Sequence, residues 1–392
     1  MAEENVREAF KPENENDQTQ GQSAMVDPQT RSLLFQRLPQ ELRDYIYRLL
    51  FSNTRFMFDT HWEGRVRPAP NGLALLRACR RARLEIGNSW LDHVLFCYGS
   101  CEDMLDHLSG LPAETLSLIR HARVGTTDLE ISKEPGVYYT LVSVLKFLTG
   151  LQLDELTVLD MAVDEPVSYN SITRLIVESS GWKTLRYICG TSGVIGFTSR
   201  SYNFLHPEPR YLRKPQPMHW QMLMERRDGV ASSPSVTIYR AKKKAQKGGF
   251  GTVLDPSKRV QFVQKSWEGP PNVFRKDKKL MTEGELEKEM LVIVKRGTGV
   301  DYEEKKDSPF AELDPDLRRD YPGMTWHQIW AEYIHGADDR ADDWEDDSED
   351  DSEDDGEDDG EDDDSIGNPA GEIDDIVDKY VDVDEYLGLF YI

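Results

Sequence analysis

One histidine and two cysteines have a spacing that would suit metal ligands, because His93, Cys97 and Cys101 recur at every fourth residue. Imidazole nitrogen and thiolate sulfur are good ligands for zinc. However, this spacing matches no common zinc module, a predicted strand ends inside it, and no fourth ligand is evident. We therefore expect Cys97 to pack as a small apolar side chain, and the sequence predicts neither a metal site nor a cofactor.

Residues for catalysis or nucleotide binding form no recognisable motif. The glycine-rich stretches 248–251 and 297–299 lack the ending of a phosphate-binding loop, so they predict turns. Neither a G-x-S-x-G elbow nor an H-E-x-x-H pair occurs. The histidines are scattered, and no matched pair of acids stands out for general acid–base work. We therefore expect a protein that is not an enzyme and has no catalytic residue.

Helices and short strands alternate from about residue 100 onward. Apolar periodicity predicts helices over 101–108, 137–148 and 171–179, and strands over 119–124, 155–159 and 185–189. Upstream it predicts strands over 55–58 and 93–98 and a helix over 73–91, and downstream a helix over 218–226 and strands over 235–239 and 289–294. This alternation indicates β/α units side by side, and a strand interval of roughly 30 residues is within the range of solenoid repeats.

The clearest single element is a helix that begins at Pro39. Proline suits the first helical position because its missing N–H is not needed there. One face of this helix carries apolar residues at helical spacing, namely Leu42, Ile46, Leu49 and Leu50. Far downstream, Trp326, Trp330 and Tyr333 have a similar spacing, which predicts a short helix that docks onto the body of the protein.

The net charge of −25 belongs entirely to the C-terminal end of the chain. Residues 338–364 hold 20 acidic residues and one basic residue, Arg340, and residues 365–392 add seven acidic residues and Lys379. Residues 1–337 are therefore neutral as a group, which argues against nucleic acid as a partner. Like charges this dense repel one another and predict a disordered tail, and the polar stretch 1–30 is also expected to be disordered.

The charge pattern suggests interactions of the tail. Residues 210–280 hold 17 Lys or Arg residues against five acidic residues, so we expect the tail to lie near this basic region and to compete with external polyanions.

The tail also carries candidate sites of its own. Ser348 and Ser352 are each followed by Glu-Asp-Asp, the setting that an acid-directed kinase prefers, and they are candidate phosphorylation sites. Apolar residues beyond residue 370 fit one helical face, which makes the end of the tail a candidate docking segment: Ile373, Ile376, Val377 and Tyr380.

Cysteine content and targeting signals favour a reducing compartment. Four cysteines are too few for a disulfide framework in a chain of 392 residues. The N-terminal residues lack the apolar core of a signal peptide, and no run of apolar residues is long enough to predict a membrane span. We therefore expect an intracellular protein of the cytoplasm or nucleus, with no membrane partner.

The N-terminal helix carries the pattern Leu38-Pro39-x-Glu41-Leu42-Arg43-x-x-Ile46-Tyr47, which resembles the first helix of an F-box. Leu75-Leu76-x-x-Cys79-Arg80 and the stretch to Leu91 resemble its later helices. More closely, the chain is similar to a group of filamentous-fungal F-box-like proteins. In that group an LPxELRxxIY helix and an LLxxCR helix precede a strand, an SLIRHxR-like segment (117–123 here) and an acidic C-terminus. Segments 236–241 and 290–305 also resemble this group, so the resemblance covers most of residues 32–335.

F-box proteins are substrate adaptors of cullin-type ubiquitin ligases. The resemblance therefore implies two partners, a Skp1-type adaptor protein and an unknown protein substrate, and it assigns substrate selection to the α/β region. Carried over by position, the residues that would face the Skp1-type protein are Leu38, Pro39, Leu42, Ile46 and Leu49. The chain departs from the ordinary F-box pattern because residues 52–72 separate the first two helices.

Two other interpretations are open at the level of the sequence. The apolar residues Leu42, Ile46, Leu49 and Leu50 would pack into the protein's own core if the helix behaves as an ordinary amphipathic helix. The chain would then be a scaffold with no link to a ligase. Alternatively, the acidic tail would make it a protein that binds basic partners such as histones.

The sequence thus predicts an α/β fold, in which an N-terminal helical F-box-like element precedes short, repeat-like β/α units and a disordered acidic tail. The expected segments are a disordered N-terminus (1–30), an F-box-like region (31–100), a β/α region (101–205), a basic, less regular α+β region (206–335), an acidic low-complexity segment (338–364) and a C-terminal tail with a short helix (365–392).

Overall fold

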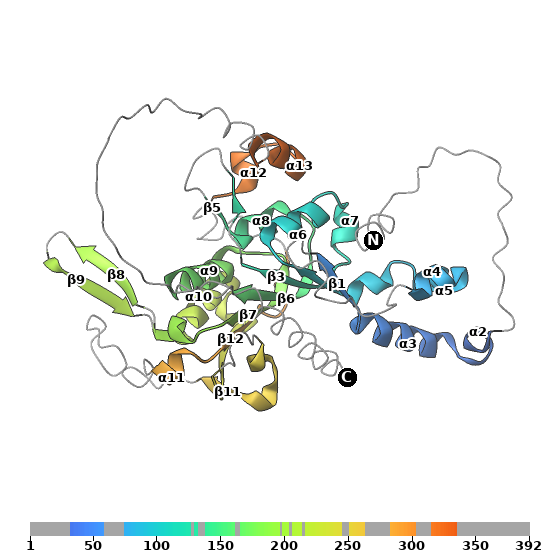
Figure 1. The fold of residues 1–392 in the computed structure, drawn as a ribbon, viewed down its shortest axis with the longest axis horizontal. Coiled ribbons are helices and arrows are strands. Elements are labelled where there is room, and N and C mark those ends of the chain that lie inside the picture. The colour runs from blue at the N-terminus through green and yellow to red at the C-terminus, as the bar shows by residue number, and fades with distance from the viewer. Residues whose placement is uncertain are drawn as a thin grey trace, which may run out of the picture. The chain divides into compact units, whose positions relative to one another are not determined.

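The computed structural model describes most of the chain between residues 32 and 334 (Figure 1). The described residues are 32–58, 74–126, 129–131, 138–160, 165–196, 198–203, 206–213, 216–244, 251–262, 283–302 and 315–334. The predictions for residues 1–30, for Ser348 and Ser352, and for the segments 338–364 and 365–392 lie outside these residues.

The chain forms two compact units, and the boundary between them falls inside one helix. The first unit takes in Met1–Ile46 and Leu73–Gly87, and the second takes in Tyr47–Gly72 and Asn88–Ile392. These units differ from the segments expected from the sequence. Residues 88–100 belong with the later strands, and the segments on either side of residue 205 share one unit.

Four short helices make up the described part of the first unit, and the last of them reaches the boundary. They are α2 (Leu33–Arg37), α3 (Gln40–Ser52, which continues into the second unit), α4 (Ala74–Ala78) and α5 (Arg80–Ile86). The helix predicted from Pro39 is therefore confirmed. The single helix predicted over 73–91 is wrong, because Cys79 has an extended backbone and its Sγ caps α5 by accepting the N–H of Ala82. Gly87, with φ of 53°, then ends α5.

A buried arginine connects the helices of the first unit. Arg43 on α3 donates from Nε and Nη2 to the two carboxylate oxygens of Glu85 on α5, each at 3.0 Å. Its Nη1 donates to the Leu38 carbonyl at 2.6 Å, and its guanidinium lies 5.5 Å from the Phe35 ring centroid on α2. This paired fork of hydrogen bonds fixes the direction of α3 against α5.

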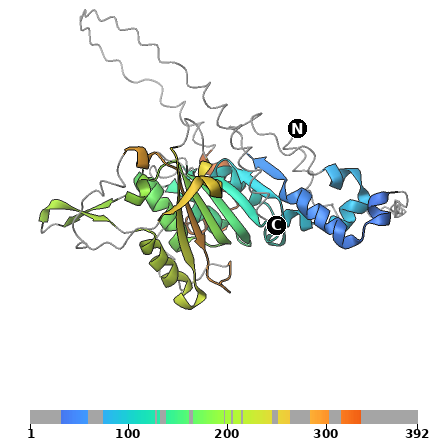
Figure 2. The same cartoon turned by 90° about the horizontal axis from the view of Figure 1, so that it is seen from below.

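The second unit is built on an eight-stranded mixed sheet, in the order β1-β2-β3-β6-β7-β12-β10-β11. The first five strands are parallel, and β12, β10 and β11 each run antiparallel to the preceding neighbour. Figure 2 shows these strands side by side. Their bounds are β1 Arg55–Phe58, β2 Leu95–Tyr98, β3 His121–Gly125, β6 Leu153–Asp160, β7 Trp182–Cys189, β10 Ser235–Ala241, β11 Arg259–Phe262 and β12 Met290–Lys295.

Within the second unit, the helices between the parallel strands β2, β3, β6 and β7 lie on one face of the sheet. Parallel neighbours that follow one another in the chain need crossovers of the same, right-handed sense, which places these crossovers on the same side. In Figure 1, α6 and α8 accordingly lie together above the strands. Helices and helical turns of this unit are η1 Ser89–Asp92, α6 Cys101–Leu108, α7 Ala113–Leu116, α8 Leu141–Phe147, α9 Glu165–Glu178, η2 Gly193–Gly196, α10 Met218–Asp228 and η3 Val230–Ser232.

The core lies between this layer of helices and the sheet. One row of side chains across the strands is almost wholly buried: Phe96, Ala122, Leu156, Leu185, Val294 and Val236. On the opposite face, the turns η4 (Thr252–Leu254) and η5 (Pro256–Lys258) precede β11, and η4 packs Val253 and Leu254 against Ile188 and Leu291. The short helix α11 (Glu283–Leu286) leads into β12.

The α/β prediction is confirmed, and two more helix boundaries need correction, since α9 begins at Glu165, six residues before the helix predicted over 171–179. Every strand predicted between residues 55 and 294 is present in the main sheet. The helix predicted over 137–148 is wrong at its start, because Tyr138–Tyr139 forms strand β5 and Thr140 is extended. Two small hairpins branch from the sheet, one of β4 (Leu129–Glu130) with β5 and one of β8 (Thr198–Asn203) with β9 (His206–Arg213).

The aromatic cluster near residue 330 docks a short helical segment, as predicted. This segment follows α12 (Leu317–Asp320) and consists of α13 (Trp326–Ile329) and the π-helical turn η6 (Trp330–Ile334). The indole N–H of Trp326 donates to Asp106 on α6, and that of Trp330 donates to Glu102 at 2.9 Å. None of the helices in the described part of the chain has the length and apolar character needed to cross a membrane.

Candidate functional site

Four apolar side chains form an exposed stripe along α3. Leu42 is 50% exposed, Tyr45 48%, Ile46 41% and Leu49 38%. Their spacing places them on one face of the helix, one turn above another. Large apolar side chains gathered in the open on one surface are typical of a protein-interaction site. Three of the five residues predicted to face an adaptor protein are therefore brought together here.

The opposite face of α3 carries the buried side chains of the helix. Tyr47 is 5% exposed and Phe51 1%, and the ring centroid of Phe51 lies 6.4 Å from that of Trp90. Leu50 is half-buried. The alternative interpretation has Leu42, Ile46, Leu49 and Leu50 pack into the protein's own core. The first three are exposed, and the buried face of the helix is instead formed by Tyr47 and Phe51.

The two remaining predicted adaptor residues precede α3. Pro39 is exposed, whereas Leu38 is half-buried and its carbonyl accepts the hydrogen bond from Arg43. The inserted segment after α3 begins with β1, which pairs in parallel with β2 in the main sheet. The chain thus leaves the helical unit to contribute an edge strand and returns for α4, which explains why α3 and α4 are separated in the sequence.

A polar pocket lies at the amino ends of four strands. It has a volume of about 640 Å³. Four pairs of consecutive residues near the strand starts line it, together with Tyr302: Asp92 and His93, Arg120 and His121, Asp154 and Glu155, and Lys183 and Thr184. The parallel register aligns residues near the strand starts in one row, as His121, Glu155 and Thr184 show.

A hydrogen bond and an ion pair connect Asp154 in this pocket to Tyr302 and Lys183. The Tyr302 hydroxyl donates to Asp154 at 2.7 Å, and Lys183 Nζ lies 3.1 Å from the same carboxylate. Burial favours the neutral carboxyl of Asp154, but hydrogen bonds from Tyr302 and Lys183 outweigh it and lower its pKa. Burial lowers the pKa values of His93 and His121, so both imidazoles are neutral near pH 7.

The charged side chains of the pocket lie close to charges of opposite sign. Its two strong cations face three carboxylates, and Asp154 is held by Tyr302 and Lys183. Sequence reasoning missed this site because the contributing residue pairs stand about 30 residues apart. The available signal was a polar pair at or just before each predicted strand, but the strand order was needed to bring the pairs together.

The carboxyl edge of the parallel strands, where open α/β sheets usually bind ligands, is filled among the described residues. Asp160, 1% exposed at the end of β6, accepts a hydrogen bond from Thr126, and the Sγ of Cys189 lies 3.4 Å from it. Burial raises the pKa of the Cys189 thiol to about 12, which rules it out as a nucleophile near neutral pH. The cavity beside Thr126 has about 10 Å³, room for one water molecule.

The three residues of the histidine–cysteine pattern, His93, Cys97 and Cys101, have separate surroundings in the fold. Cys97 is 2% exposed within β2, as expected for a small apolar side chain, and Cys101 is 1% exposed at the start of α6. His93 instead lines the polar pocket. Within the described ranges, no group of three or more His, Cys, Asp or Glu side chains is arranged to hold a metal ion. None of the four cysteines, all of which lie in the described part of the chain, forms a disulfide.

Comparisons with known proteins identify no relative of this chain. No protein-family model, no curated protein and no solved structure matches the chain.

Proposed function

We propose that this chain is a non-enzymatic, F-box-like substrate adaptor that binds a Skp1-type protein of a cullin-type ubiquitin ligase in the cytoplasm or nucleus. The observation that carries the proposal is the exposed apolar stripe on α3, formed by Leu42, Tyr45, Ile46 and Leu49. These residues belong to the helix whose sequence resembles the first F-box helix, and the protein's own core does not use them.

The helical unit supports the same proposal. An adaptor needs a rigid surface for the ligase and a separate body for the substrate. Here α2, α4, α5 and the first half of α3 form a compact unit of their own, whereas the sheet belongs to the other unit. Burying apolar surface contributes about 25 cal/mol per Å², so a stripe of four large side chains offers substantial binding free energy. The polar pocket and the sheet would then be the place where a protein substrate binds.

The test is a calorimetric titration of the full-length chain with a purified fungal Skp1-type protein. The full chain is required because α3 continues from one unit into the other. Wild-type protein should bind, and the double variant Leu42→Glu, Ile46→Glu should lose at least a hundredfold in affinity, because two charges would be buried without partners. The matched control is Met222→Glu on α10, which is 57% exposed and should bind within twofold of wild type.

Circular dichroism and thermal unfolding should show that all three proteins are folded. Absence of binding by folded wild type would remove the ligase from the proposal and favour a scaffold with the same fold. Equal binding by wild type and the α3 variant would show that the ligase protein uses another surface.

A further inference from the structure

The polar pocket at the amino ends of the parallel strands has its charges arranged in a row. The strand order β2-β3-β6-β7 places Asp92 and His93 at one end of this row and Lys183 at the other. Neighbouring strands lie about 4.8 Å apart, so the starts of β2 and β7 are separated by about 14 Å. The two ends of the pocket can therefore contact two different groups of one ligand.

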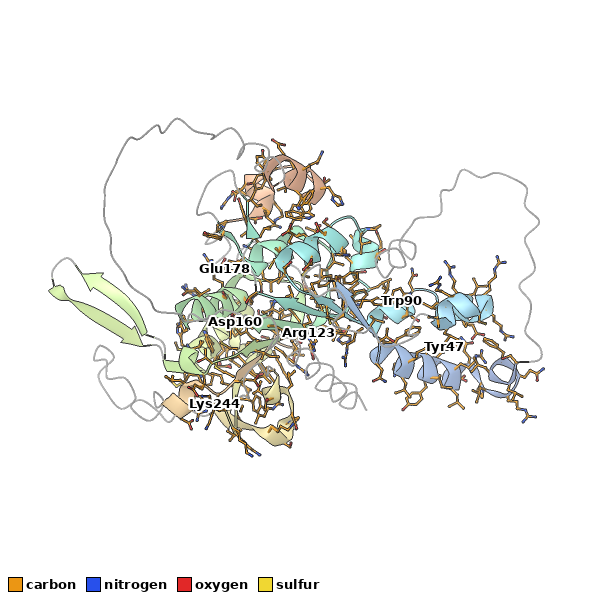
Figure 3. All side chains as sticks on the ribbon, viewed as in Figure 1. Tyr47, Trp90, Arg123, Asp160, Glu178 and Lys244 are labelled. Atoms are coloured by element: carbon orange, nitrogen blue, oxygen red, sulfur yellow. The ribbon has the colours of Figure 1, made fainter. Side chains whose placement is uncertain are left out.

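The helical turn η1 holds Asp92 at the β2 end. Trp90 on the same turn packs against Phe51 and Phe56, with ring centroids 6.4 Å and 5.8 Å apart, and Figure 3 shows it next to the edge strand β1. Asp92 is half-buried, and its Oδ1 is buried with no hydrogen-bond partner among the described residues. A carboxylate in this state favours a cation beside it.

Two histidines near Asp92 add no positive charge to the β2 end. Burial lowers the pKa values of His93 and His121, so both are neutral near pH 7. The Arg48 guanidinium on α3 also acts on His93, but less strongly than the Asp92 carboxylate does. The β2 end of the pocket is therefore negative.

The β6–β7 end has the opposite sign. Arg120 Nη1 donates to the Gln152 carbonyl at 3.0 Å and to the Tyr302 hydroxyl at 3.3 Å, and both acceptors are neutral. The Arg120 guanidinium and Lys183 Nζ lie 5.7 Å and 4.7 Å from the centroid of the Tyr302 ring. One carboxylate, Asp154, lies 3.1 Å from Lys183 and also interacts with the charge of Arg120. Two cations thus share one anion at this end.

The third carboxylate of the pocket does not change this balance. Glu155 pairs with Arg186 at 3.0 Å. A simple anion on Arg120 and Lys183 would leave Asp92 without compensation, and a simple cation at Asp92 would leave the other end positive. A ligand with one charge of each sign matches both ends, and a pocket of about 640 Å³ is large enough for a small ligand or a chain end.

An arginine or lysine with a free α-carboxylate carries its two charges at a suitable separation. In the extended side chain the cation lies about 7 Å from the carboxylate. A charge-assisted hydrogen bond of about 2.8 Å at each end brings the total to about 13 Å, close to the distance between the starts of β2 and β7. A basic residue inside a chain lacks the carboxylate, so the last residue of a protein or the free amino acid is required.

We propose that this pocket binds a basic residue that has a free α-carboxylate, as found at the end of a protein that finishes in arginine or lysine. The α-carboxylate lies on Arg120 and Lys183, and the side-chain cation lies beside Asp92. That such a chain end marks a substrate rests on the proposed adaptor function. The binding chemistry itself does not involve α3 and is measured without the ligase.

Fluorescence anisotropy of the full-length chain tests the proposal with a labelled octapeptide of glycine and serine that ends in arginine. Wild type should bind it at least about tenfold more tightly than the same peptide with an amidated end or with alanine as its last residue, because each change removes a charge-assisted hydrogen bond. Unlabelled L-arginine distinguishes the two sources. Competition at the dissociation constant of the peptide assigns the ligand to the free amino acid, and competition only at tenfold higher concentration assigns it to a chain end. Equal binding of all three peptides, or of none, together with no competition by L-arginine would overturn the proposal.

Two variants separate the ends of the pocket. Asp92→Asn should lose the preference for arginine over alanine and keep the preference for a free carboxylate over an amide. Arg120→Gln should lose the second preference and keep the first. The matched controls Asp44→Asn and Arg83→Gln, at exposed positions outside the pocket, should keep both.

Circular dichroism should show that all variants are folded, and the peptide preferences of wild type test the pocket without any substitution. Unchanged preferences in both folded pocket variants would place the peptide elsewhere and contradict the inference. Binding of the Skp1-type protein without peptide selectivity would leave the adaptor function and remove this inference. Peptide selectivity without binding of the Skp1-type protein would leave the pocket and remove the ligase.

Discussion

At the scale of single residues, Glu289 is the most unusual group in the second unit. Its side chain is 0% exposed, and its carboxylate accepts the backbone N–H groups of Gly251 at 2.6 Å and Val253 at 2.9 Å. These bonds hold η4 over the apolar cluster around Ile188 and Leu291. Burial nevertheless outweighs them and raises the pKa of Glu289 to about 7.

The raised pKa predicts a pH dependence of stability. Between pH 4.5 and 7 the folded chain binds more protons at Glu289 than the unfolded chain does. The contribution to the free energy of unfolding is therefore full below pH 4.5 and lost as pH rises through 7. A shift of this size corresponds to about 3 kcal/mol. Glu289→Gln should remove this slope, so urea denaturation of wild type and variant should diverge across the window. Parallel curves would contradict the assignment.

At the scale of elements, the helical unit depends on one ion pair. Arg43 is 6% exposed, and Glu85 accepts two hydrogen bonds from it and one from Arg81 at 3.3 Å. Truncating one member of a buried pair leaves the other charge without compensation, whereas replacing both with apolar residues is often neutral. The pair therefore determines whether α3 and α5 stay together.

Arg43→Ala should destabilise α3, α4 and α5 by about 3 kcal/mol while the sheet stays protected. Arg43→Met, Glu85→Met should recover most of this loss, and Arg48→Ala, on the exposed side of α3, should cost less than about 0.5 kcal/mol. Amide hydrogen exchange resolves the helices from the sheet. An even loss of protection over both units would show that the helical unit does not unfold separately.

At the scale of the whole molecule, charge is separated along the chain. The net charge of −25 resides in residues 338–392, and the rest is neutral as a group. Within the body, residues 210–280 hold 17 Lys or Arg residues against five acidic residues. An acidic segment on the same chain then competes with any external polyanion for these cations.

Removal of residues 338–392 should raise the affinity for heparin, measured as the salt concentration needed for elution from a heparin column. Added salt should weaken the interaction, since the Debye length is about 8 Å at 0.15 M. In the shortened chain, Lys243→Gln, Lys258→Gln should lower the elution salt, because this variant removes two charges from the basic region. Unchanged elution after removal of residues 338–392 would show that the tail does not compete with polyanions.

The sequence by itself determined the local structure of this protein. Apolar periodicity located α3, α6, the docked Trp326 segment and the strands of the main sheet, because periodicity follows directly from which faces are buried. Where a short-range feature overrode the pattern, as at Cys79 and Thr140, the prediction of one continuous helix failed. These breaks depend on single backbone conformations that the apolar pattern does not encode.

Only the tertiary structure decided which surfaces are available. Both faces of α3 are apolar, so the sequence could not choose between Leu42, Ile46 and Leu49 on one side and Tyr47 and Phe51 on the other. The insertion of β12 between β7 and β10 also depends on pairing between distant strands. Strand order and register, which depend on contacts far apart in sequence, brought the polar pairs into one pocket.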